Sequence, residues 1–72
     1  EEIDETRESI LAKQEEIRKV VEQFPNFSAG WFAYAVGWLQ LGRNGEALKA
    51  IQRAHALNPN DETVEYYLAA LS

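Results

Sequence analysis

The sequence predicts an all-α fold, and three observations indicate it. Apolar residues recur at helical spacing in each long segment, no segment shows the strict alternation typical of a half-buried strand, and turn-forming residues separate the segments. The predicted helices cover residues 4–24, 28–41, 45–57 and 61–71. The connections between them are short, which predicts neighbouring helices that run roughly antiparallel.

The first helix is indicated by large apolar residues that recur every seven positions. These residues are Ile3, Ile10, Ile17 and Phe24. They fall on one helical face, and Gln14 is the polar exception on that face. Pro25 predicts the end of the helix, because the residue before a proline is pushed out of the α region.

Capping residues mark the boundaries of the other three helices. The candidate N-caps are Asn26 and Ser28 for the second helix, Asn44 for the third, and Asn60 and Asp61 for the fourth. Gly42 is placed to end the second helix in a left-handed conformation.

Residues 28–61 carry a set of aromatic, small and large residues at fixed spacing. In order, the set is Trp31, Tyr34, Ala35, Trp38, Ala47, Ile51, Ala54, Leu57 and Pro59. This pattern resembles one tetratricopeptide repeat of about 34 residues. Residues 1–27 resemble a preceding half-repeat with a long helix, although Lys13 stands where alanine is expected. Residues 62–72 resemble a following half-repeat or capping helix, with Glu65 in place of tryptophan.

We therefore treat residues 1–72 as a single helical domain of one repeat between two half-repeats, a tetratricopeptide-like superhelix. The small Ala35 and Ala47 predict a close approach of two antiparallel helices. The aromatic residues are expected to fill the space beside that approach. The expected contacts are of Trp31, Tyr34 and Trp38 with Ile51, Ala54 and Leu57.

The resemblance implies a protein-interaction module that binds a peptide or partner subunit along a concave surface. Carried over by position, that surface consists of Phe32, Val36, Leu39, Gln40, Tyr66 and Ala70. It carries no charge, which favours an amphipathic helix or an apolar peptide read by packing. The alternative is that the first helix or the end of the chain covers this face.

Helix packing leads to a second expectation, about the opposite side of the second helix. Ala29, Ala33 and Gly37 recur every fourth residue and form a smooth strip. A glycine inside a helix costs about 1 kcal/mol relative to alanine, so a packing reason is expected at Gly37. We predict that the first helix docks on this strip and that Gly37→Leu destabilises the fold.

The second functional hypothesis is a structural element whose faces are used in self-association. The predicted first helix is longer than the third, and Ile3 and Ile10 lie on the overhang, where a second copy of the chain would cover them. Isolated repeats usually need about three units for stability, which favours a homo-oligomer or an excised fragment. The absence of methionine indicates an excerpt or an engineered sequence.

Composition argues against other classes of function. The net charge of −5 disfavours nucleic-acid and anionic-membrane binding. The chain has no cysteine and one histidine, His55, so we expect no metal, no cofactor and no catalytic residue, and therefore no enzyme. The sequence leaves the compartment open, with a soluble, cytoplasmic protein as the default expectation.

Overall fold

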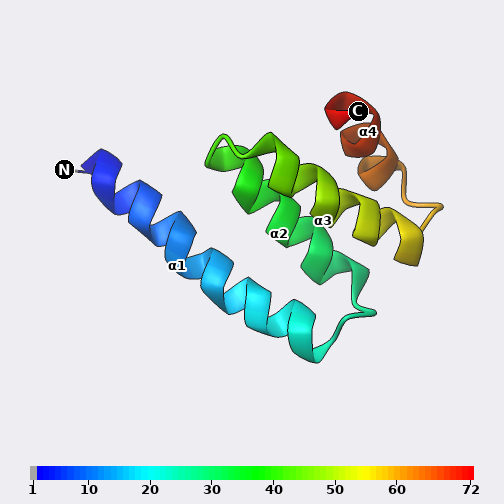
Figure 1. Cartoon of the computed structure of the whole chain (residues 1–72), viewed down its shortest axis with the longest axis horizontal. Coiled ribbons are helices and arrows are strands. Elements are labelled where there is room, and N and C mark those ends of the chain that lie inside the picture. Colours follow the sequence, from blue (N-terminus) through cyan, green and yellow to red (C-terminus); the bar gives the residue numbers. More distant parts are fainter. Residues whose placement is uncertain (1) are drawn as a thin grey trace.

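The computed structural model describes the backbone of residues 2–72 and the side chains of residues 7–72. These residues form four helices, α1 (Glu2–Gln23), α2 (Ser28–Gln40), α3 (Asn44–Leu57) and α4 (Glu62–Leu71), and no strand (Figure 1). The predicted all-α fold is confirmed, and each helix end lies within two residues of its predicted position.

The helices form an open array in which each packs on its neighbour in the chain. α2 and α3 make the largest contact, α1 packs on α2, and α4 packs on α3. Figure 1 shows α1 and α4 on opposite sides of the central α2–α3 pair. The molecule measures 40 × 28 × 16 Å and exposes 5079 Å². A compact monomer of 8.2 kDa is expected to expose about 4,500 Å², so this open array exposes more surface than a compact protein of its size.

The core lies where α2, α3 and α4 meet. Its buried residues are Ala35, Ala50, Ile51, Ala54 and Val64. Ala35 and Ala47 are both fully buried, in agreement with the close approach predicted for α2 and α3. Alanine at these positions lets the backbones come near each other, while larger side chains on all three helices fill the flanks.

The aromatic residues of α2 are half-buried, and two of the three predicted to pack beside the core, Trp31 and Tyr34, do so. Trp31 and Tyr34 pack against the core, but their rings, with that of Trp38, also stack edge to face along the helix at 6.3 and 5.6 Å. The Trp31 Nε1 donates to the Pro25 carbonyl at 2.8 Å, and Arg53 lies 5.6 Å from the Trp31 ring. Leu57 is half-buried outside the core cluster.

The turn between α2 and α3 depends on Gly42, as predicted. Its φ of 77° lies in the left-handed region that favours glycine. The Gly42 N–H donates to the Leu39 carbonyl at 3.0 Å, and the Arg43 N–H donates to the Trp38 carbonyl at 2.8 Å. These two bonds satisfy the last carbonyls of α2 in a Schellman arrangement.

The N-caps predicted for two of the three helices, α2 and α3, are wrong. The carbonyls of Phe27 and Arg43 accept the first helical hydrogen bonds of α2 and α3, so these residues are the caps, and neither side chain makes a capping bond. Ser28 and Asn44 are already the first helical residues. At α4 the prediction of Asp61 is confirmed, because its carboxylate accepts from the backbone N–H groups at positions 63 and 64.

The helix ends and turns recur with an offset of 34 residues. α1 and α3 end at Gln23 and Leu57, and α2 and α4 begin at Ser28 and Glu62. The two turns also share their hydrogen bonds. The pairs are Phe24 N–H to Val20 O with Asn58 N–H to Ala54 O, and Phe27 N–H to Phe24 O with Asp61 N–H to Asn58 O. α1 is longer than α3, because residues 2–9 precede the position that matches the start of α3, an excess of about 12 Å.

Candidate functional site

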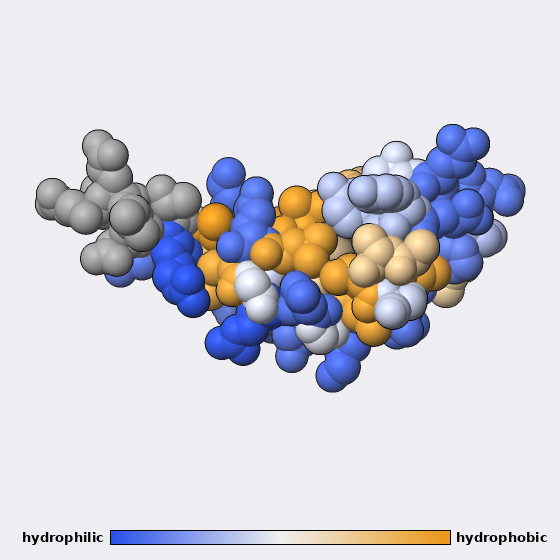
Figure 2. All heavy atoms as spheres, turned by 90° about the horizontal axis from the view of Figure 1, so that it is seen from above, coloured by the Kyte–Doolittle hydropathy of each residue, from blue (hydrophilic) through white to orange (hydrophobic). Residues whose placement is uncertain are grey.

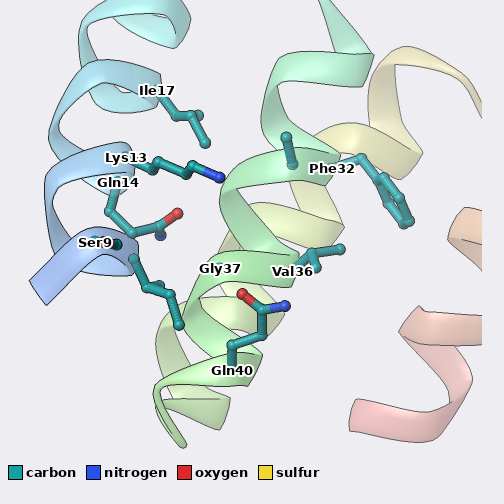
Figure 3. A pocket seen from close by; sticks show the side chains of 10 residues that line it. Ser9, Lys13, Gln14, Ile17, Phe32, Val36, Gly37 and Gln40 are labelled. Carbon is teal, nitrogen blue, oxygen red and sulfur yellow. The ribbon is translucent and has the colours of Figure 1, made fainter. Parts of the chain in front are cut away.

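A groove of about 610 Å³ lies between α1 and α2 and is called here the α1–α2 groove (Figure 3). It is lined by Ser9, Ile10, Lys13, Gln14 and Ile17 of α1 and by Phe32, Ala33, Val36, Gly37 and Gln40 of α2. Apolar side chains from both helices therefore form its walls. Figure 2 likewise shows apolar residues gathered over the middle of the molecule, with hydrophilic residues on either side.

The floor of the groove is a contact between Gln14 and α2. Gln14 is the one buried polar side chain of the described residues, and its Nε2 donates to the Tyr34 carbonyl at 3.0 Å. Its amide lies directly against Gly37, where a β-carbon would overlap it. The absence of a side chain at Gly37 thus lets a polar side chain of α1 reach the α2 backbone, and the two helices are held together beneath the groove.

The strip predicted on α2 is used only in part. Gly37 is covered by α1 as expected, but Ala29 is exposed and Ala33 is an exposed part of the groove wall. The second covered position is Gly30, which lies against the Val20 and Val21 side chains. Positions 30 and 37 are seven residues apart, two helical turns, so they share one face more closely than residues spaced by four.

The groove carries a charge that the sequence did not predict there. Lys13 reaches from α1 toward α2 across the groove, as Figure 3 shows, and it is the one charged residue of the lining. The ion pairs of the described residues are Arg18 with Glu15, Arg18 with Glu22, and His55 with Glu65, so none involves Lys13. Gln14 and Gln40 add amide groups to the same groove.

The residues predicted for the concave surface do not form one lining. Phe32, Val36 and Gln40 line the groove, and the Phe32 ring also meets Tyr67 of α4 edge to face at 5.3 Å. Leu39 is half-buried outside the lining. Tyr66 and Ala70 are exposed on α4 and lie outside the groove, because α4 packs on the far side of α2–α3 from α1.

The two residues predicted for self-association have different outcomes. Ile10 is half-buried in the groove wall, so it is shielded in a single chain more than a helix overhang implies. The side chain of Ile3 lies outside the described residues.

The contribution of α1 to the groove was missed in the sequence, although two signals pointed to it. Gln14 interrupts the apolar stripe of α1, and Lys13 replaces the alanine expected from the repeat. Both residues now face the groove. Periodicity alone does not place either residue in space, because Gln14 is buried against α2 whereas Lys13 is exposed.

Electrostatic pairing on α1 lies outside the groove. Arg18 donates to Glu15 and to Glu22, at 2.8 Å in each case, on the exposed surface of the helix. The hydrogen bond from Arg18, and then its positive charge, hold the pKa of Glu15 below its ordinary value of 4.5. None of these three residues lines the groove.

A second, smaller hollow and a contact of His55 lie away from the α1–α2 groove. The hollow, about 330 Å³, lies between α2 and α3, lined by Trp31, Tyr34, Glu46, Lys49, Ala50 and Arg53. His55 is half-buried on α3, with its Nε2 4.0 Å from a Glu65 carboxylate oxygen of α4. Within residues 7–72, no three acidic or histidine side chains are grouped so as to hold a metal ion. No helix of the described chain is long and apolar enough to span a bilayer.

Comparison with known proteins finds no matching protein-family model, no matching curated protein and no matching solved structure.

Proposed function

We propose that this chain is a protein-interaction module, a tetratricopeptide-like helical array that binds a peptide or a partner subunit in the α1–α2 groove. The observation that carries the proposal is the groove itself, with its apolar walls from two helices and a volume of about 610 Å³. Grooves of this kind accept apolar side chains of an amphipathic segment, which are removed from water on binding.

The distribution of apolar surface supports the same proposal. Val20, Phe24 and Phe27 at the end of α1 and the following turn are 37%, 60% and 54% exposed. Val20 and Phe27 both lie beside Gly30, which belongs to the helix that forms one wall of the groove, and both lie outside the groove lining. Clustered exposed apolar residues on a small protein are typical of surfaces that bind another molecule.

The repeat spacing of 34 residues supports the resemblance on which the proposal rests. It joins the sequence pattern of residues 28–61 to the recurrence of the helix ends and the turn hydrogen bonds. Repeats of this kind stack into extended surfaces that bind partners.

The proposal is tested by selecting peptides that bind the immobilised chain from a displayed library of amphipathic sequences. Selected peptides should lose at least tenfold in affinity for the Val36→Lys variant, because a charge in the groove wall costs desolvation. Leu11→Lys is the matched control, since Leu11 is 45% exposed on α1 and outside the groove lining. Equal affinity for the two variants, with both folded by circular dichroism, would contradict the proposal.

A further inference from the structure

The 34-residue offset between α1 and α3 indicates what kind of ligand the groove accommodates. Ala47, Ile51 and Ala54 of α3 are fully buried, and α2 is the helix that packs most extensively on α3. The residues 34 positions earlier on α1 are Lys13, Ile17 and Val20. They are exposed or half-buried, and Lys13 and Ile17 line the groove.

The other wall of the groove obeys the same correspondence. α2 contacts α4 through the rings of Phe32 and Tyr67, at 5.3 Å. The residue 34 positions before Tyr67 is Ala33, which is exposed in the groove wall. In the groove, α1 exposes positions that match those of α3 packed on α2. Likewise, α2 exposes a position that matches the residue of α4 in contact with α2.

We infer that the α1–α2 groove is a seat for an α-helix that lies on α1 and α2 as α2 lies on α3 and α4, and that this helix carries an acidic residue facing Lys13. This inference rests on the proposed function and specifies its ligand: an amphipathic helix of a partner protein that runs antiparallel to α1.

The charge of Lys13 indicates which residue the bound helix should carry opposite it. Lys13 is the one charged residue of the groove lining, it points across the groove, and it takes part in none of the ion pairs of the described residues. The matching position on α3 is Ala47. Ala47 and Trp38 lie at the same end of the α2–α3 pair, each about one turn from Gly42. The acidic residue is thus expected at the position of the bound helix that corresponds to Trp38.

The probe that follows is a fluorescein-labelled, acetylated and amidated peptide with the sequence of residues 28–40. Three versions replace the residue that corresponds to Trp38 by Glu, Gln or Lys, and binding to the intact chain is measured by fluorescence anisotropy. The Glu peptide should bind about two- to fivefold more tightly than the Gln peptide, and the Lys peptide more weakly than both. Higher salt should reduce these differences.

Two protein variants isolate the role of Lys13. Lys13→Gln should abolish the preference for the Glu peptide, whereas Lys49→Gln, an equal charge change on α3 outside the groove, should leave it intact. Binding of all three peptides with equal affinity, or a preference that survives Lys13→Gln, would overturn the inference while the proposed function stood.

Two further outcomes are informative. If none of the three peptides binds, the inference is wrong, and the library selection then decides the proposed function independently. Light scattering over a dilution series should give the monomer mass. A concentration-dependent dimer that Lys13→Glu dissociates would instead assign the groove to a second copy of the chain and overturn the inference.

Discussion

The side-chain amide of Gln14 rests on the backbone of Gly37, a position that carries no side chain. Any β-carbon at position 37 would overlap the amide. The amide in turn donates from Nε2 to the Tyr34 carbonyl at 3.0 Å, one helical turn before Gly37. This contact joins α1 to the α2–α3 pair at the floor of the groove, so the stability of the array and the shape of the groove depend on the same two residues.

Gly37→Leu should destabilise the chain by about 2–3 kcal/mol, because the new side chain must expel Gln14 and push α1 away from α2. Urea unfolding followed by circular dichroism measures the change. Gly45→Leu is the control. No atom lies within 4 Å of a β-carbon at Gly45, and replacing a helical glycine there should stabilise by about 0.5–1 kcal/mol. A similar change at both positions would show that the contact does not hold the helices together.

The coupling between Gln14 and Gly37 is measured by a double-mutant cycle with alanine. Gly37→Ala is expected to be neutral or destabilising in the wild-type background, since the gain in helix propensity is offset by displacement of the amide. In the Gln14→Ala background the same change should stabilise, with a coupling energy of about 1–2 kcal/mol. Additive effects in the cycle would refute a direct contact.

Asp61→Ala should cost about 1 kcal/mol of stability, because the Asp61 carboxylate caps α4 by accepting from two backbone N–H groups. Asn44→Ala is the comparison at the start of α3. The cap of α3 is Arg43, and no side-chain capping bond forms there, so this variant should lose much less. Thermal unfolding of both variants tests the assignment, and it fails if Asn44→Ala is the more damaging.

The ion pair of Glu15 with Arg18 should add pH-dependent stability. The Arg18 hydrogen bond and charge lower the pKa of Glu15 from its ordinary 4.5 in the folded chain. Because the pKa of Glu15 is lower in the folded chain, its ionised carboxylate stabilises the fold at pH above about 4.5. This contribution is lost as the pH falls through the lowered pKa of Glu15. Glu15→Gln should therefore be less stable than wild type at pH 7, and the difference should shrink at about pH 3.

The effect is expected to be small because both side chains are largely exposed. Glu8→Gln on the same helix is the control, since Glu8 is in none of the ion pairs of the described residues. Chemical unfolding at the two pH values measures both variants. A loss for Glu15→Gln that is the same at both pH values would contradict the pairing.

Local chemistry made most of the fold predictable. Apolar periodicity and turn residues give the four helices, Gly42 gives a left-handed turn, and Asp61 gives a cap, because each depends on neighbours within a few residues. The other N-caps were mispredicted because Ser28 and Asn44 sit one residue inside the helices they were expected to cap. In each case the first hydrogen bond is accepted by the preceding residue. Sequence patterns do not define the first residue of a helix to better than one or two positions, so an error of one residue is expected.

The candidate site was less predictable, because it is formed between helices. The sequence placed Phe32, Val36 and Gln40 on one face of the second helix, and they do share the groove wall. It also placed Tyr66 on this surface, and that side chain is 70% exposed on α4 and lies outside the groove lining.

The sequence by itself determined that this chain forms four helices, where they lie to within two residues, and which small residues let α2 and α3 pack closely. Only the tertiary structure decided that Gln14 lies on Gly37 and that Lys13 enters the groove. The physical reason is that helix formation follows from bonds and side chains a few residues apart. The rotation of α1 about its own axis is instead fixed by contacts with another helix, such as that of Gln14 with Tyr34, 20 positions away along the chain.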